Sequence, residues 1–309
     1  MEMSILIAFL AATIVAGTSI LLAALGELIA ERSGILNLGV EGMMLVGAVT
    51  GFLMAIKTGN HWYGLLAAML AGGLLAALHA FICVTMRGNQ VVSGLALTIL
   101  GTGISGVVGK AYQGVPLSNP FKAVHIPGLA DIPVLGPILF RQDALVYCSI
   151  LIAIIIWYVF YRSRWGLSIR AVGQNPAAAD AVGISVSRVR YCCTILGGVL
   201  AGMGGAYLSL AYAPSWQENM TAGRGWIAVA LVIFALWNPL RAIMGAYLFG
   251  GVEALTFRLQ IIGISISSFY LAMLPYLLTI LVLALVTIRL RQETGTPAAL
   301  GLAYDREER

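Results

Sequence analysis

The chain has 309 residues, of which 60% are hydrophobic and only 10% are charged. Since an average soluble domain carries about 25% charged residues, this composition excludes a soluble globular protein and predicts a polytopic membrane protein. The formal net charge of +5 does not indicate nucleic-acid binding, because the basic residues stand at the ends of apolar segments and form no single patch.

The apolar segments predict nine membrane-spanning helices, because about 20 apolar residues are needed to cross a hydrocarbon core of about 30 Å. We expect them at residues 4–25, 36–56, 62–85, 91–109, 144–161, 191–212, 223–237, 240–258 and 269–289. The seventh of these segments is short enough to be a broken or displaced helix. The predicted fold class is an all-α polytopic membrane protein.

Lys and Arg residues predict the orientation, because translocated short loops are depleted in them. If the polar segment 162–190 is cytoplasmic, twelve of the 18 basic residues share its side and six lie on the other. We therefore expect an external amino terminus and a cytoplasmic carboxyl terminus. One transmembrane domain then consists of a first half at about 4–110, an external loop at 111–143, a cytoplasmic loop at 162–190, a second half at about 191–290 and a cytoplasmic tail at 291–309.

The second predicted helix contains a carboxylate whose role is open. Asn37 is placed to cap this helix, and Glu41 follows one turn inside it. The helix dipole favours a negative charge there by about 0.3–1 kcal/mol, so a structural contact explains Glu41 as well as a functional role does. In the third helix, His79 is expected to form an inter-helix hydrogen bond, because no second metal ligand stands at helical spacing beside it.

The fourth predicted helix is rich in small and hydroxyl-bearing residues, so we expect it to be buried. Close helix packing and a path-lining role both explain this composition. The connection Tyr112–Asp143 that follows contains five prolines and is long for a bare loop. It suggests either a surface for another protein or an ordered lid made of turns.

The second half contains a glycine-rich face and a further carboxylate. The run Gly197–Gly205 in the sixth helix predicts tight helix packing. Glu253 in the eighth helix is not at the helical spacing to Arg258 that would make an ion pair, so we expect it to face protein or a wet cavity.

A weak internal repeat suggests two related halves. The pattern Ala-x-Leu-x-Gly-Gly-x-x-Ala begins at Ala68 and again at Ala246. Halves related by inversion would place a solute path at their interface. The predicted path residues carry polar or adaptable side chains that are costly against lipid, and they are Asn37, Glu41, Met44, Ser93, Thr98, Phe249 and Glu253.

The polar segment 162–190 contains a predicted helix of barely two turns. Asn175 is placed to cap it, Pro176 suits its first position, and Gly183 can close it in the left-handed conformation. So short a helix is marginal alone in water and needs packing. Its shallow alanine face suits a groove in another protein, and packing on its own domain is the alternative.

Two stretches resemble a family of transport proteins. Gly166–Ile184 resembles the coupling loop of the inner-membrane permeases of binding-protein-dependent ABC importers, in the family for branched-chain amino acids, ribose and nucleosides. Glu31–Met44 resembles the amino-terminal motif of the nucleoside and simple-sugar branch. The resemblance covers almost the whole chain and implies a type II importer-like permease for nucleosides in the bacterial inner membrane. Simple sugars and branched-chain amino acids are the alternative substrates.

The same resemblance implies three partners. They are an ATPase subunit that binds ATP, a periplasmic or lipid-anchored substrate-binding protein, and a second, different permease subunit. It also implies that the coupling loop receives motion from the ATPase. The residues predicted to transmit this motion are Arg170, Gly173, Asn175, Pro176, Ala179, Asp180 and Gly183.

The sequence lacks the phosphate-binding motif GxxxxGK[S/T], so we expect neither ATP hydrolysis nor a cofactor in this chain. Its four cysteines lack the spacing of a metal site. An ion-coupled carrier and a passive channel are the other candidate classes. The intramembrane ionisable residues are few and scattered for a proton relay, and a docking loop has no purpose in a channel, so an ABC permease is favoured.

Overall fold

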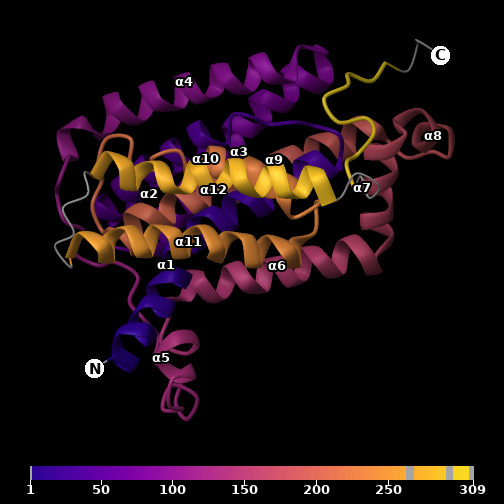
Figure 1. Cartoon of the computed structure of the whole chain (residues 1–309). Helices are drawn as coiled ribbons and strands as arrows, with labels where there is room; N and C mark the ends of the chain where they lie inside the picture. The colour runs from indigo at the N-terminus through magenta and orange to yellow at the C-terminus, as the bar shows by residue number, and fades with distance from the viewer. Residues whose placement is uncertain (1, 262–267, 290–294, 306–309) are drawn as a thin grey trace.

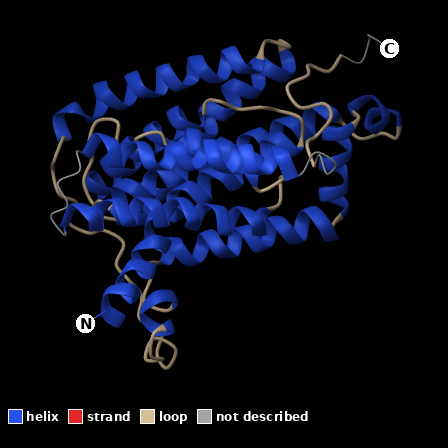
Figure 2. Cartoon of the chain, viewed as in Figure 1, coloured by secondary structure: helices blue, strands red, loops and turns tan. Residues whose placement is uncertain are grey.

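The computed structural model describes residues 2–261, 268–289 and 295–305. Throughout these ranges the chain forms helices joined by turns and loops, without a β-strand (Figure 2). The helices are α1 (Glu2–Arg32), α2 (Val40–Thr58), α3 (His61–Ala80), α4 (Gln90–Gly109), α5 (Leu135–Leu139), α6 (Ala144–Arg162), α7 (Arg164–Gln174), α8 (Pro176–Ala181), α9 (Val186–Tyr207), α10 (Arg224–Phe234), α11 (Pro239–Ile261) and α12 (Ser268–Arg289). Two π-helical turns, Phe81–Thr85 and Leu208–Tyr212, extend α3 and α9, and a 3-10 turn, Lys110–Tyr112, extends α4.

A helix lies on each of the nine apolar segments, but they differ in length. Within the described residues, seven helices are long and apolar enough to cross a membrane, namely α1, α2, α3, α4, α6, α9 and α11. Helix α10 has 11 residues and is about 16 Å long, which is about half of a hydrocarbon core. Helix α12 has 22 residues and contains Pro275 in its interior. The all-α membrane fold is confirmed, whereas nine spanning helices are not.

The two halves of the chain interpenetrate at the centre of the bundle. Helix α1 packs mainly against α9, α10 and α11, and α9 packs mainly against α1, α2 and α3 (Figure 1). Glycines set how closely these helices approach. A Cβ atom on Gly202 of α9 would lie 2.3 Å from the carbonyl oxygen of Ala68 in α3, nearer than real Cβ atoms come. The predicted glycine face of α9 therefore packs within this chain.

Loops and short helices gather at the two ends of the bundle (Figure 1). At one end, α7, α8 and residues 295–305 meet the end of α1, and the amide of Ala299 donates to Gly173 O (2.9 Å). An ion pair between Arg87 and Asp305 joins the α3–α4 turn to the same end. These are the segments that the count of basic residues places on one side of the membrane. Of the predicted tail, residues 291–294 and 306–309 lie outside the described residues, as do residues 262–267 and 290 of the predicted second half.

At the opposite end, the long connection after α4 is ordered by backbone pairing. The amide of Gly114 donates to Trp216 O (3.1 Å), and that of Leu117 donates to Pro214 O (2.9 Å). Trp216 is buried directly against Gly109. The predicted external connection is therefore anchored to the segment that precedes α10.

Candidate functional site: two carboxylates at the start of a half-length helix

Helix α2 begins inside the bundle, because the segment before it folds back along α1. The amide of Asn37 donates to Glu27 Oε1 (2.8 Å), and Glu27 lies five residues before the end of α1. Asn37 was expected to cap α2, but the structure places Gly39 at the N-cap and uses the Asn37 carboxamide to accept from the Gly39 amide (3.0 Å). The chain needs this extra turn to change direction before α2 starts.

Helix α10 also begins inside the bundle, directly against the start of α2. Gly223 is its N-cap with φ +82°, a left-handed conformation that favours glycine. A Cβ atom on Gly225 would lie 2.6 Å from Glu41 Cα, so only glycine allows this approach. Two helix amino termini, each with unpaired amides and a partial positive charge, therefore meet in the interior.

The carboxylate of Glu41 lies between these two amino termini. Its Oε1 accepts from the hydroxyl of Thr221 (2.6 Å) and the amide of Gly223 (2.9 Å), and its Oε2 accepts from the amide of Gly225 (2.7 Å). The side chain is only 7% exposed. Glu41 therefore caps α10 from another helix, and its negative charge offsets the partial charges of both termini.

The second carboxylate, Glu253 of α11, holds the first side chain of α10. Arg224 forms an ion pair with Glu253, and the guanidinium lies 5.2 Å from the ring centroid of Tyr212. The Tyr212 hydroxyl donates to Glu253 Oε1 (3.0 Å), while Arg224 also donates to Met220 O (3.1 Å). Sequence spacing missed this pair because its members stand on different helices.

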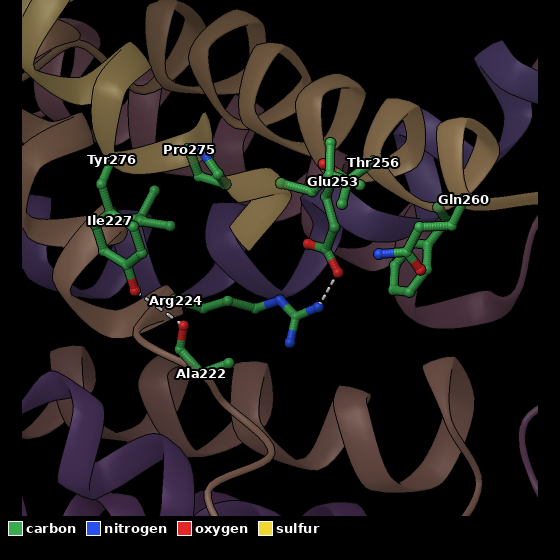
Figure 3. A pocket seen from close by; sticks show the side chains of 10 residues that line it. Ala222, Arg224, Ile227, Glu253, Thr256, Gln260, Pro275 and Tyr276 are labelled. Carbon is green, nitrogen blue, oxygen red and sulfur yellow. Dashed lines mark hydrogen bonds and ion pairs between the residues drawn. The ribbon is translucent and has the colours of Figure 1, made fainter. Parts of the chain in front are cut away.

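A cavity of about 470 Å³ opens beside this ion pair, between α10, α11 and α12 (Figure 3). Glu253, Thr256 and Gln260 line it from α11. Leu271, Pro275 and Tyr276 line it from α12. The Tyr276 hydroxyl donates to the carbonyl oxygen of Ala222 (3.1 Å), which fixes the aromatic ring at one end of the cavity.

The other predicted path residues lie outside this cavity. Thr98 lies with Asn37 and Glu41 around the start of α2, where its hydroxyl donates to Leu38 O (2.9 Å). Met44 and Phe249 are 0% and 1% exposed in the helical core. The structure therefore brings Asn37, Glu41 and Thr98 together and leaves Glu253 as the predicted residue that lines the cavity.

Ser93 forms a separate buried contact. Its hydroxyl lies 2.9 Å from His79 Nδ1, and His79 Nε2 lies 3.1 Å from Leu36 O. The expectation that His79 joins helices by hydrogen bonds is confirmed.

Two buried carboxylates of α1 were missed as site residues. Glu27 and Glu31 are each 1% exposed. Glu31 Oε2 accepts from Trp237 Nε1 (2.5 Å), at the turn that follows α10, just as Glu27 accepts from Asn37 before α2. Their i, i+4 spacing in an apolar helix was the available signal. Together they attach the segment before α2 and the segment after α10 to α1.

With this geometry in place, the sequence can be compared with known proteins. Residues 9–290 match the family described as branched-chain amino acid transport system / permease component. The chain belongs to this permease family. It is 43% identical to TsgC13 of Haloferax volcanii, an ABC transporter permease protein, over 99% of both chains. It is 38% identical to NupQ, the guanosine ABC transporter permease protein of Bacillus subtilis, over 88% of this chain and 89% of NupQ.

The fold is also shared with a solved transporter. A metal-chelate type ABC transporter in an inward-facing conformation matches 91% of this chain and 85% of its own, with a TM-score of 0.53 and 15% identity. Family members and relatives are permease components, so this chain is a transport subunit and not an enzyme. Membership of this family implies that the chain acts together with an ATPase and a substrate-binding protein.

The polar segment 162–190 contains the predicted short helix, α8. Asn175 Oδ1 accepts from the amide of Ala178 (3.0 Å), Pro176 occupies the first turn, and Gly183 has φ +86°. Ala179 is only 3% exposed and packs with Val172 and other apolar side chains of the loop. The face of α8 that remains available is formed by Ala177, Ala178, Ala181 and Val182.

The remaining predicted coupling residues hold the loop in place. A Cβ atom on Gly173 would lie 2.1 Å from Arg32 O, so this glycine sets the contact between α7 and α1. The Arg170 guanidinium lies 5.5 Å from the ring centroid of Tyr161. Asp180 is half-buried beside a polar cavity of about 210 Å³.

Proposed function

We propose that this permease carries nucleosides, or simple sugars of similar chemistry, inward across the cytoplasmic membrane. The names of its relatives support this substrate class, since NupQ is named for guanosine and TsgC13 for glucose. The observation that carries the proposal is the Arg224–Glu253 pair, which leaves the cavity without a net charge. A neutral polar solute leaves this ion pair intact, whereas the ammonium and carboxylate groups of an amino acid would have to compete with it for Glu253 and Arg224.

Transport is driven by a separate ATPase that docks on α8. The exposed residues Ala178, Ala181 and Val182 form a small apolar face, and α8 is tied to the bundle through the buried Ala179. A push on α8 can therefore reach α7, and through Gly173 the end of α1. In this proposal Gly173, Arg170 and Ala179 transmit motion from behind the docking face, and Asn175, Pro176, Asp180 and Gly183 shape the helix.

The solute path runs between two halves of inverted topology that cross the membrane nine times in total. The geometry that supports this is the meeting of α2 and α10, two helices that begin inside the protein at glycine N-caps and point their amino termini at each other. The predicted path residues around this point are Asn37, Glu41 and Thr98. Met44, Ser93 and Phe249 join the path only after the core rearranges.

A second, different permease subunit completes the transporter. Helix α4 supports this, because its outer face carries Thr102 and Gly103 beside a cavity of about 400 Å³ that also contains Lys110 and Glu218. Such a polar surface is costly against lipid and is better covered by protein or water. The amino terminus lies outside, and α8 and the carboxyl terminus lie in the cytoplasm.

Binding measurements on the cognate substrate-binding protein test the substrate class. Calorimetric titration of this binding protein with guanosine, glucose and leucine should show binding of guanosine or glucose and no binding of leucine. A preference for leucine would overturn the assignment. Co-purification of the permease with its neighbouring subunits tests the rest, since a complex with one kind of permease chain would contradict the heterodimer.

A further inference from the structure

The cavity beside the Arg224–Glu253 pair has a polar edge and an apolar wall (Figure 3). Glu253, Thr256 and Gln260 stand three and four residues apart, so they share one face of α11 and extend over roughly 10 Å. The opposite wall comes from Leu271, Pro275 and Tyr276 of α12. A volume of about 470 Å³ lies within the range of roughly 300–1,000 Å³ for small-molecule sites.

Polar atoms on this edge have bonding capacity left for a ligand. Among the described residues, both hydrogen bonds to Glu253 end on Oε1, which leaves Oε2 as an acceptor. The Thr256 hydroxyl donates to Val252 O (3.0 Å), so its oxygen can still accept. Buried polar groups normally have partners, so this set calls for a ligand or water.

Position in the bundle makes an empty, dry cavity costly. Glu253, Thr256 and Gln260 all lie in α11, one of the helices able to span a membrane. Polar groups at that depth are stable only where they face protein or a water-filled space. The cavity is therefore wetted, and a solute that enters it can exchange with water.

We propose that this cavity is a solute subsite for a neutral ring that carries several hydroxyl groups, such as the ribose of a nucleoside or a hexose. Solute hydroxyls donate to Glu253 Oε2 and exchange hydrogen bonds with Thr256 and Gln260. The flat face of the solute packs on Tyr276 and its apolar neighbours. The inference rests on the proposed transport function and assigns the place of recognition within the permease.

Uptake of radiolabelled solute into proteoliposomes tests the subsite. The complete transporter is reconstituted with ATP and with an excess of solute-loaded binding protein, so that affinity of the binding protein does not limit the rate. Guanosine, 2′-deoxyguanosine, 3′-deoxyguanosine and glucose are the probes. Thr256→Val and Gln260→Met should each lower the rate for at least one hydroxylated probe about 3- to 10-fold, as the loss of one hydrogen bond predicts.

Thr279→Val is the matched control. Its hydroxyl donates to Pro275 O (2.9 Å), four residues back, as that of Thr256 does to Val252, but Thr279 does not line the cavity. It should transport at the wild-type rate. If Thr256→Val slows guanosine uptake, the subsite binds a nucleoside, and if it slows glucose uptake, the subsite binds a hexose. The deoxyguanosine that lacks the contacted hydroxyl should be transported at the same rate by Thr256→Val as by the wild type.

The outcomes separate the subsite from the transport function. Equal rates for Thr256→Val, Gln260→Met and Thr279→Val, each close to wild type, would overturn the subsite and leave the permease function intact. Failure of the wild-type transporter to move any of the four probes would overturn both.

Discussion

Replacing Glu41 with alanine should destabilise the protein by removing the cap of α10. Three donors end on its carboxylate, namely the hydroxyl of Thr221 and the amides of Gly223 and Gly225. Each buried donor left without an acceptor costs about 1–3 kcal/mol, and the lost charge at the helix terminus costs about 0.3–1 kcal/mol more. Because water can satisfy part of this loss, we expect a net loss of about 3–5 kcal/mol.

Glu41→Gln should have an intermediate effect, because the carboxamide keeps the shape and one acceptor but loses the charge and the second acceptor. The expected loss is about 1–3 kcal/mol. Glu218→Ala is the matched control, because this carboxylate is exposed at the end of the bundle opposite α7 and α8. Surface substitutions of this kind usually change stability by no more than about 0.5 kcal/mol.

Thermal unfolding of the purified protein in detergent measures these differences. For a chain of this size, about 4 kcal/mol lowers the melting temperature by roughly 6 °C. The expected order of melting temperatures is wild type, then Glu41→Gln, then Glu41→Ala. A Glu41→Ala protein that melts within about 2 °C of wild type would refute the inference that this carboxylate holds the two helix starts together.

Three further predictions concern other parts of the chain. Asp143 caps α6, and burial raises its pKa although the amides of Leu145 and Val146 oppose the shift. Because the pKa is raised in the folded state, the stability of the protein falls as pH rises through it, and Asp143→Asn should flatten this dependence in a pH series of unfolding curves. Asp143→Ala should also lose about 1 kcal/mol of capping. Ala178→Asp on the exposed face of α8 should abolish co-purification with the ATPase without lowering the melting temperature. Ala179→Asp, at the buried position, should reduce co-purification and also lower the melting temperature. Identical behaviour of the two variants would contradict the assigned faces. Gly225→Ala should cost about 1–3 kcal/mol in denaturant unfolding because its Cβ meets Glu41, and a neutral result would contradict the close approach.

The sequence located the helices well but could not set their lengths in the membrane. Apolar composition marks every segment that avoids water, so it found all nine helical segments. It does not show whether a segment crosses the whole membrane or stops inside it. Helix α10 is short because its start is held by Glu41 of α2, while Trp237, which follows its end, donates to Glu31 of α1. Both partners are distant in the sequence.

Local signals predicted helix α8, whereas its orientation depended on packing. Asn175, Pro176 and Gly183 act through their own backbone and nearest neighbours, so capping rules predicted α8 correctly. Alanines occupy most positions of this six-residue helix, and periodicity therefore cannot distinguish its faces. Only the packing of Val172 and Tyr304 decides that Ala179 is buried and Ala178 is exposed.

The sequence alone determined the class of protein, the helical segments and the resemblance to permeases, because composition, capping and contiguous motifs act over short ranges of chain. Tertiary structure alone decided the partners of the intramembrane charges. Glu41 meets amides more than 180 residues away, and Glu253 meets an arginine on another helix. The reason is physical: a buried charge is stabilised by whichever opposite charge or amide the packing brings to it, and helix packing is not encoded in residue spacing.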